Sequence, residues 1–227
     1  MENKSLLSVV VPVYNEVKTI QTILDRIKKV AVEKEIIVVD DFSTDGTREI
    51  LSQINDPQIR VVLKPKNGGK GSAVKEGIKA ASGDYIIIQD ADLEYDPEDF
   101  HLLLKAMTEK KGDVIYGSRF LGSSNFPSLS HKIGNKFLTL VTNLLYGSKI
   151  TDMETCYKLI PAKIAKSLNI QSKKFDMEPE ITAKILKSGN KIAEVPIGYK
   201  GRAFSEGKKI SWKDAFSAIW TLVKYRF

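Results

Sequence analysis

The sequence predicts an α/β fold in which a doubly wound, mostly parallel sheet carries helices on both faces. Short apolar segments that are typical of buried strands alternate with segments of helical periodicity along residues 5–120. The connections between them are short, as they are in doubly wound sheets. The first, second and fourth apolar segments also end in carboxylates. In this class of fold, ligands bind beyond that end of the strands.

The first half of the chain contains strands and helices in regular alternation. Continuous apolar runs predict strands at residues 5–16, 35–41, 59–64, 85–92 and 113–120. Apolar residues at helical spacing predict helices at residues 19–30, 42–54, 71–82 and 98–110. Gly83 is expected to close the third helix, and Asp96 with Pro97 forms an N-cap and first-turn pair for the fourth.

The second half is less regular. We expect a polar loop at residues 121–131 and a mainly apolar helix at 132–147. A strand is expected at 151–160, helices at 161–170 and 178–189, and a last strand at 191–200. No composition break or linker separates the two halves, so residues 1–227 are predicted to form one domain.

Composition favours anionic partners and limits the chemistry. The chain has 227 residues and a formal net charge of +7, which favours phosphorylated small molecules or anionic lipid. No zinc-finger, helix-turn-helix or RNP pattern is present, so we expect no nucleic-acid partner. With Cys156 as the single cysteine and His101 and His131 as the two histidines, we expect any metal to be a hard cation held by carboxylates.

The apolar segments and the cysteine content also indicate the cellular compartment of the protein. None approaches the roughly 20 residues that a membrane span needs, and the N-terminus lacks the layout of a signal peptide. A single cysteine fits a reducing compartment. These features predict a cytoplasmic protein.

Two carboxylates follow the fourth predicted strand in the stretch YIIIQDADLEYD. Asp90 and Asp92 are two residues apart, so on an extended backbone they point the same way and can share an ion. A cation there would offset their repulsion and could carry the diphosphate of a nucleotide. A glycine-rich stretch at residues 64–74 is the other candidate phosphate site. It does not match the Walker pattern, and only Lys70 and Gly71 are kept as candidates for binding an anion at a helix N-terminus.

Several motifs resemble those of inverting family-2 glycosyltransferases with the GT-A fold. In the first half these are VVVPVYNE, IIVVDDFSTDGT, NGGKGSAV and QDADLEYDP. In the second half TDMETCYKLI, FDMEPEITAKI and VPIGYKGRAFSEGKKISW resemble the dolichol- and polyprenol-phosphate sugar synthases. The resemblance covers residues 6–212. It implies transfer of a sugar from a nucleotide-sugar donor to a polyprenyl or dolichyl phosphate.

The resemblance also implies roles for individual residues. A divalent cation, Mg²⁺ or Mn²⁺, would be bound by Asp90, Asp92 and Glu94, although relatives often carry glutamine at the last position. The nucleotide would be bound by Pro12, Tyr14, Glu16, Val38, Asp40 and Ala91. Besides Asp92, the catalytic set would comprise the phosphate-binding residues Arg119, Arg202 and Lys208. Lys132 stands where relatives often have arginine, which puts a bidentate phosphate contact there in doubt.

Within the single domain, the resemblance implies a nucleotide-sugar-binding half at residues 1–120, an acceptor half at 121–207 and an amphipathic C-terminal helix at 208–227. Basic residues surround one face of that helix, and the face itself carries the apolar residues Trp212, Phe216, Ile219, Trp220, Val223 and Phe227. We therefore expect peripheral contact with the cytoplasmic face of a membrane; packing of the helix on the core is the open alternative. Since relatives often carry transmembrane helices or use a separate membrane subunit, such a subunit is a candidate partner.

A second function stays open, namely transfer to a saccharide hydroxyl in cell-surface polysaccharide synthesis. That reaction needs a carboxylate base, and Asp176 or Glu178 would be the candidate. We interpret both instead as acids favoured at a helix N-terminus. The donor is equally open among GDP-mannose, UDP-glucose and UDP-N-acetylhexosamine, as are the prenyl chain length and the oligomeric state.

Overall fold

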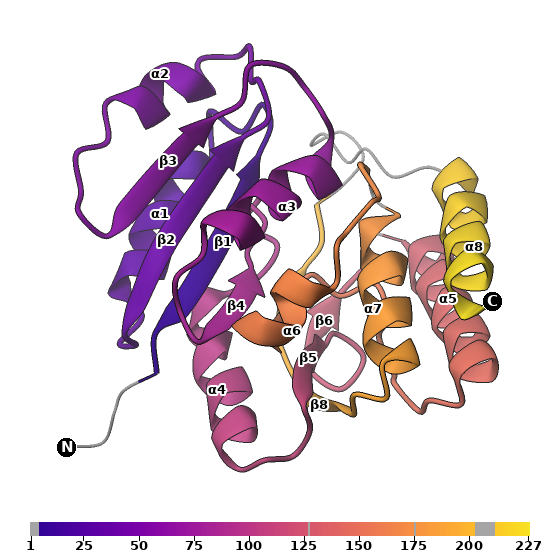
Figure 1. The fold of residues 1–227 in the computed structure, drawn as a ribbon. Coiled ribbons are helices and arrows are strands. Elements are labelled where there is room, and N and C mark those ends of the chain that lie inside the picture. The colour runs from indigo at the N-terminus through magenta and orange to yellow at the C-terminus, as the bar shows by residue number, and fades with distance from the viewer. Residues whose placement is uncertain (1–4, 127, 175, 203–211) are drawn as a thin grey trace.

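The computed structural model describes residues 5–126, 128–174, 176–202 and 212–227 (Figure 1). Within these ranges, seven strands form the central sheet: β1 (Leu7–Val13), β2 (Lys34–Asp40), β3 (Ile59–Leu63), β4 (Tyr85–Ile88), β5 (Val114–Ser118), β7 (Lys158–Pro161) and β8 (Ile192–Pro196). Two short strands, β6 (Ser124–Asn125) and β9 (Tyr199–Lys200), pair separately in parallel.

Helices connect these strands along the described chain. They are α1 (Ile20–Lys29), α2 (Thr47–Ser52), α3 (Lys70–Ala80), α4 (Phe100–Thr108), α5 (Leu129–Tyr146), α6 (Ala162–Ser167), α7 (Met177–Lys187) and α8 (Trp212–Arg226). A short 3₁₀ turn, Pro97–Asp99, precedes α4, and the Asp96 carboxylate accepts from the backbone N–H of Glu98 at its start. This cap is the one that the sequence predicted.

The sheet confirms the predicted fold class. Its strand order is β3-β2-β1-β4-β7-β5-β8. β7 runs antiparallel to its neighbours β4 and β5, whereas the other pairings are parallel. In Figure 1, α3 passes in front of β1 and β2 while α1 lies behind them. Gly77 allows the close approach of α3, because a Cβ at that position would lie 2.2 Å from Cγ1 of Val10.

The first, second and fourth strands end at one edge of the sheet. β1 lies between β2 and β4 and is parallel to both. The side chains of β1 are all buried, so its position is fixed by apolar packing on both faces. The residues that follow these three strands therefore meet at a common edge, as the sequence predicted.

Several predicted elements differ from the observed ones in their bounds. α5 begins at Leu129 instead of residue 132, because the Ser128 side chain caps it by accepting from the N–H of His131. Only the end of the predicted strand 151–160 is extended, as β7. α3 ends at Ala80, and Gly83 lies beyond it, donating its N–H to the Ser8 hydroxyl.

A second, smaller apolar cluster joins α5, α7 and α8. It contains Leu138 of α5, Ala183 of α7 and Ala218 with Leu222 of α8. α8 therefore packs on the domain through one side, and membrane contact through its other side stays a prediction. In the described parts of the chain, no helix combines the length and the apolar character that a membrane crossing requires.

Candidate active site

Two loops at the common edge are tied to each other by hydrogen bonds. Asn15 adopts a left-handed conformation (φ 56°), donates its N–H to the Ser43 hydroxyl (2.9 Å) and accepts from the N–H of Thr44 (2.8 Å). The N–H of Glu16 donates to the Thr47 hydroxyl at 3.1 Å. These bonds fix the turn after β1 to the turn after β2, and they hold Glu16 at the edge.

Arg202 brings carboxylates from two strand ends together. Its guanidinium NH2 group lies 3.1 Å from Glu16, which follows β1, and 3.0 Å from Asp92, which follows β4. Its Nε lies 3.8 Å from the carboxylate of Glu94. The acidic residues that the sequence placed at the strand ends thus share a cation that belongs to the protein.

The segment that carries Arg202 is anchored on Glu94. The N–H of Arg202 donates to one carboxylate oxygen of Glu94 (2.7 Å), and the Tyr199 hydroxyl donates to the other (2.7 Å). The backbone also joins the two segments, because the N–H of Lys200 donates to the Glu94 carbonyl at 2.9 Å. Both carboxylate oxygens of Glu94, the predicted third metal ligand, are therefore engaged by the protein. The same holds for Asp90, which Lys70 contacts, and for Asp92, which accepts from Arg202 and from the N–H of Glu94. The assignment of the three as metal ligands stays a prediction.

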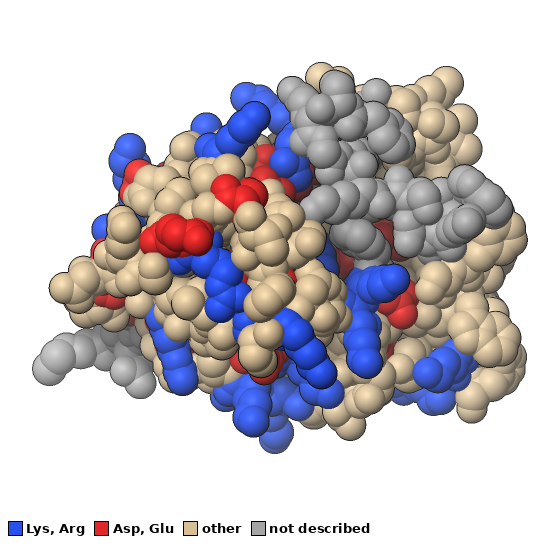
Figure 2. All heavy atoms as spheres, turned by 90° about the horizontal axis from the view of Figure 1, so that it is seen from above, with Lys and Arg blue, Asp and Glu red and all other residues tan. Residues whose placement is uncertain are grey.

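Lys70 is the second cation at this edge. Its ammonium group lies 2.7 Å from Asp90 and 3.8 Å from Glu178. Glu178 in turn pairs with Lys158, which is fully buried and also donates to the carbonyl of Thr155. A chain of alternating charges thus runs from the strand end into the start of α7. Seen from above, lysine and arginine side chains are interspersed with several carboxylates on this face of the molecule (Figure 2).

The electrostatics of Asp92 indicate an excess of negative charge. Burial, followed by the neighbouring carboxylates of Asp90 and Glu94, raises the pKa of Asp92 to about 7 against the opposing effect of Arg202. A divalent cation would relieve this repulsion.

Hard carboxylate oxygens suit Mg²⁺ or Mn²⁺, so Asp90 and Asp92 fit such an ion. In the described ranges, no group of three or more His, Cys, Asp or Glu residues is arranged to hold a metal.

The predicted nucleotide-binding residues fall into two groups. Tyr14 and Glu16 lie at the edge with partly exposed side chains. Val38 is fully buried in the sheet, and Pro12 and Ala91 are also buried, so the part of all three in a nucleotide pocket stays a prediction. The Asp40 carboxylate is buried as well. It accepts from the N–H groups of Phe42 and Ser43 and lies 3.3 Å from Arg48, so it shapes the turn after β2.

Arg119 has a carboxylate partner of its own. Its Nε and NH2 groups bind the two oxygens of Asp152 at 2.7 Å, and the pair is almost completely buried. The guanidinium also lies over the Tyr199 ring, 5.1 Å from its centroid. In this arrangement Arg119 supports the β9 segment, and a direct phosphate contact stays a prediction.

The glycine-rich stretch packs closely instead of leaving its amides open. The N–H groups of Gly68 and Gly69 donate to the carboxylate of Asp41, and that of Gly71 donates to the carbonyl of Lys173. A Cβ on Gly69 or Gly71 would lie 2.2 Å from a backbone oxygen. The anion site considered at Lys70 and Gly71 is therefore filled by the chain itself. Lys132 is exposed on α5, and Lys208 lies outside the described residues.

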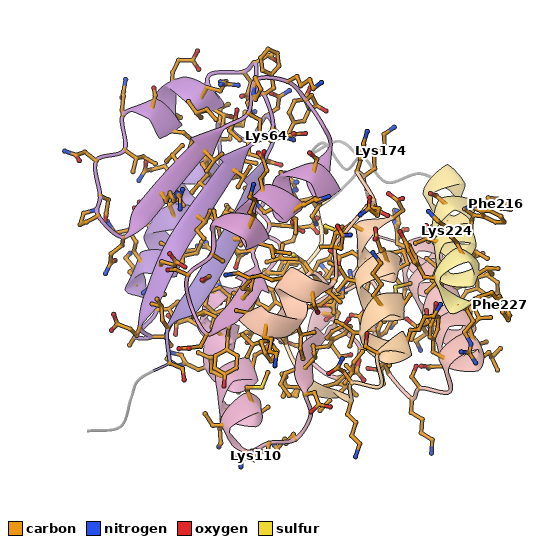
Figure 3. The ribbon with its side chains drawn as sticks, in the orientation of Figure 1. Lys64, Lys110, Lys174, Phe216, Lys224 and Phe227 are labelled. Atoms are coloured by element: carbon orange, nitrogen blue, oxygen red, sulfur yellow. The ribbon has the colours of Figure 1, made fainter. Side chains whose placement is uncertain are left out.

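The sequence reasoning did not pick out the ionic side chains of Lys64, Lys158 and Glu154. Asp41 pairs with Lys64, which points into the same edge from the end of β3 (Figure 3). Lys158 interrupts the apolar stretch CYKLI, and such a lysine needs a carboxylate partner when it is buried. Glu154 is largely buried, one of its carboxylate oxygens makes no hydrogen bond, and burial raises its pKa to about 7. Of these residues, Lys158 could have been found from the sequence, because a lone lysine within an apolar run indicates a buried ion pair.

Comparison with known proteins places this geometry in context. The family model described as glycosyl transferase family 2 matches residues 8–168. An undecaprenyl-phosphate mannosyltransferase of Micrococcus luteus is 28% identical over 210 residues, which cover 88% of this chain and 85% of that protein. An uncharacterized protein of Methanocaldococcus jannaschii is 34% identical over 203 residues, covering 86% of this chain and 82% of that protein.

Solved structures share the fold. A crystal structure of glucosyl-3-phosphoglycerate synthase from Mycobacterium tuberculosis, in complex with Mn²⁺, UDP and phosphoglyceric acid, aligns with a TM-score of 0.71. The alignment covers 99% of this chain and 79% of that protein at 20% sequence identity. At that identity the likeness establishes the architecture, which is the GT-A arrangement of glycosyltransferases.

Proposed function

This chain belongs to glycosyltransferase family 2, and from that premise we propose that it transfers a sugar, with inversion, from a nucleotide-sugar donor to a polyprenyl or dolichyl phosphate. The donor would be of the GDP-mannose or UDP-glucose class. One observation carries the proposal: Arg202 contacts Glu16 and Asp92 at the edge where Asp90 and Asp92 converge. A phosphate-binding group thus stands beside the carboxylates suited to a cation, as two anionic substrates require.

Asp90 and Asp92 would hold the divalent cation, Mg²⁺ or Mn²⁺. When bound, this ion supplies a positive charge for the leaving diphosphate. The Mn²⁺ and UDP in the structurally similar synthase support this choice of cofactor and donor. Tyr14 and Glu16, which the paired loops hold at the edge, would contact the nucleotide.

In the proposed step a phosphate oxygen of the acceptor attacks the anomeric carbon of the donor sugar. A new carbon–oxygen bond forms on one face, while the bond to the diphosphate oxygen breaks on the other and its electron pair leaves with the nucleoside diphosphate. Arg202 would bind the acceptor phosphate once its guanidinium exchanges a carboxylate for a phosphate partner. Both are planar, bidentate contacts that arginine makes well.

The state of Glu178 favours a phosphate acceptor over a saccharide hydroxyl. A hydroxyl acceptor needs a carboxylate base, but Glu178 is buried, pairs with Lys158 and lies near Lys70. Glu178 lies in the first turn of α7, as the sequence predicted for an acid at a helix N-terminus. The ion pair with Lys158 occupies this buried carboxylate, so it is poorly placed to take a proton from an acceptor hydroxyl. Asp176 occupies the N-cap position of α7 without a side-chain capping bond, and its carboxylate accepts from the N–H of Lys174. A phosphate monoester, with its second pKa near 6, needs no base.

The related mannosyltransferase acts, by its name, on undecaprenyl phosphate, which supports a lipid-phosphate acceptor for this chain as well. A chain using such an acceptor would work at the periphery of the cytoplasmic membrane face, alone or with a separate membrane subunit.

A donor screen tests the function. The full chain is incubated with Mn²⁺ or Mg²⁺, a short-chain polyprenyl phosphate and each of GDP-mannose, UDP-glucose and UDP-N-acetylglucosamine, and release of nucleoside diphosphate is measured. We expect release with one donor class, which depends on both the acceptor and the metal.

A parallel arm offers an oligosaccharide in place of the lipid phosphate. Product formed only in that arm would overturn the lipid-phosphate assignment and favour the saccharide-hydroxyl alternative.

A further inference from the structure

One face of α5 exposes a continuous stripe of large apolar side chains. Its members are between 53% and 76% exposed: Leu129, Ile133, Phe137, Leu140 and Leu144. Successive residues of an α-helix are rotated by about 100°, so these five lie within about 80° of arc. Isolated apolar side chains on a surface are ordinary, but a contiguous patch of this kind marks an interaction site.

The opposite side of α5 satisfies the needs of the fold. Leu138, Thr139 and Thr142 are buried there, and Leu138 belongs to the apolar cluster shared with α7 and α8. The exposed stripe is therefore not required for packing α5 on the domain.

The charge around the stripe favours an anionic binding surface. α5 contains no acidic residue over its 18 positions, LSHKIGNKFLTLVTNLLY, while Lys132 and Lys136 are exposed beside the stripe. The neighbouring helix α8 adds exposed Lys224 and Arg226 in its last turn. An apolar face bordered by basic residues suits an interface that is apolar inside and anionic at its surface.

α8 extends the apolar surface at the edge of the domain. Its residues Phe216, Trp220 and Phe227 are at least 67% exposed, while Ala218 and Leu222 pack inward. Figure 3 shows Phe216 and Phe227 pointing outward from α8, away from the domain. α8 is fixed to α5 through the hydrogen bond from the Tyr146 hydroxyl to the Leu222 carbonyl at 2.7 Å.

A chain of contacts connects α5 with the catalytic edge. Asn135 of α5 accepts from the guanidinium of Arg119 (3.3 Å), and Arg119 lies over the ring of Tyr199. The Tyr199 hydroxyl donates to Glu94, whose carboxylate anchors Arg202. The beginning of the α5 stripe therefore lies a few side chains from the proposed acceptor site.

We propose that the outward face of α5, extended by α8, docks on the surface of an anionic phospholipid bilayer. α5 supplies most of the apolar contact, and the helix would lie in the plane of the interface. The choice of a bilayer rests on the proposed function, in which the acceptor is a lipid phosphate. Docking through α5 would bring that phosphate to the catalytic edge without removing the prenyl chain from the membrane.

Charge argues against a second copy of the chain as the occupant. A symmetric contact through this face would bring Lys132 and Lys136 of both copies together without an acidic residue of α5 to compensate. Anionic headgroups provide that compensation directly.

Vesicle sedimentation with the full chain and no substrate tests the inference. We expect binding to vesicles of phosphatidylcholine with phosphatidylglycerol, and weaker binding to phosphatidylcholine alone. The triple variant Ile133→Gln/Leu140→Gln/Leu144→Gln should lose about tenfold or more of the partition coefficient, because three apolar side chains no longer enter the interface. Circular dichroism checks that this variant keeps its helices.

A matched control changes exposed leucines elsewhere. Leu63, Leu102 and Leu121 are 39–51% exposed on β3, on α4 and in the loop after β5, and their triple glutamine variant should bind like wild type. Equal binding of wild type and the α5 variant would overturn the inference. So would a wild-type dimer that the α5 variant dissociates and that binds no vesicles, because the face would then join two copies.

A detergent assay with a short-chain polyprenyl phosphate separates this inference from the proposed function. If the α5 variant transfers sugar in detergent but does not bind vesicles, both stand. If wild type binds vesicles through α5 but transfers no sugar to the lipid phosphate, the proposed function fails and the docking surface stands.

Discussion

The guanidinium of Arg202 lies 3.0 Å from the carboxylate of Asp92, although 110 residues separate them in the sequence. Asp92 follows the central strand β4, and Arg202 follows β9 at the far end of the chain. The contact joins the carboxylates suited to a divalent cation to the residue suited to an acceptor phosphate. Arg202 thus offsets the same negative charge that a metal would offset, which gives its removal two opposite consequences.

Replacing Arg202 by methionine should strengthen metal binding and weaken catalysis. Without the guanidinium, Asp92 and Glu16 lose their cation, so we expect Mn²⁺ to bind about tenfold more tightly by electron paramagnetic resonance titration of the free protein. Loss of the phosphate contact should lower kcat/KM by about 100-fold or more.

The exposed Arg26 of α1 provides a control, and Arg26→Met should change neither quantity. A fall in both Mn²⁺ affinity and turnover in Arg202→Met would contradict the competition between Arg202 and the metal.

Asp92→Asn should abolish metal-dependent transfer. The substitution keeps the size of the side chain but removes one of the two carboxylates assigned to the cation, so we expect turnover to fall by about 1,000-fold, together with weaker Mn²⁺ binding. Turnover is measured as nucleoside diphosphate release. Asp25→Asn on the exposed face of α1 is the matched change. Retained activity in Asp92→Asn would show that the metal assignment is wrong.

The buried pair of Lys158 and Glu178 predicts that removing one partner lowers stability far more than removing both. Both side chains are buried, so Lys158→Met leaves a carboxylate without its main cation. We expect a loss of about 3–5 kcal/mol in the free energy of unfolding, measured by urea denaturation. The double variant Lys158→Met/Glu178→Leu should recover most of this loss, because no charge is then left buried. A double variant that is less stable than the single one would argue that the pair is net stabilising.

The sequence predicted the features that depend on local pattern. Alternating apolar strands and helices gave the parallel core, and the position of Asp90 and Asp92 after β4 followed from the strand itself. The pairing of Lys70 with Asp90 was not predicted, because it depends on how α3 packs across the sheet. Nor could periodicity tell which face of α5 is buried. That helix carries apolar residues on both sides, and only its contact with α7 and α8 shows which stripe remains outside.

The strand predicted at residues 151–160 is longer than the observed antiparallel strand β7 (Lys158–Pro161) for a related reason. Most of residues 151–160 serve to place charged and polar side chains at the site, such as Asp152 against Arg119. Only Lys158–Pro161 pairs with the sheet, between β4 and β5. A segment that is extended for so few residues has too short a pattern to be separated from a loop.

Glu154 predicts a pH dependence of stability. Burial, and then the charge of Glu178, raises the pKa of Glu154 from 4.5 to about 7. Between these values the folded chain binds the proton more tightly than the unfolded chain, so the free energy of unfolding falls as pH rises from 4.5 to 7. Glu154→Gln has no proton to lose and should be more stable than wild type by about 1–3 kcal/mol at pH 8, with little difference at pH 4.5. Urea denaturation at both pH values measures this, with the exposed Glu98→Gln as control. Equal pH dependence in wild type and Glu154→Gln would show that Glu154 is ionised without cost in the folded protein.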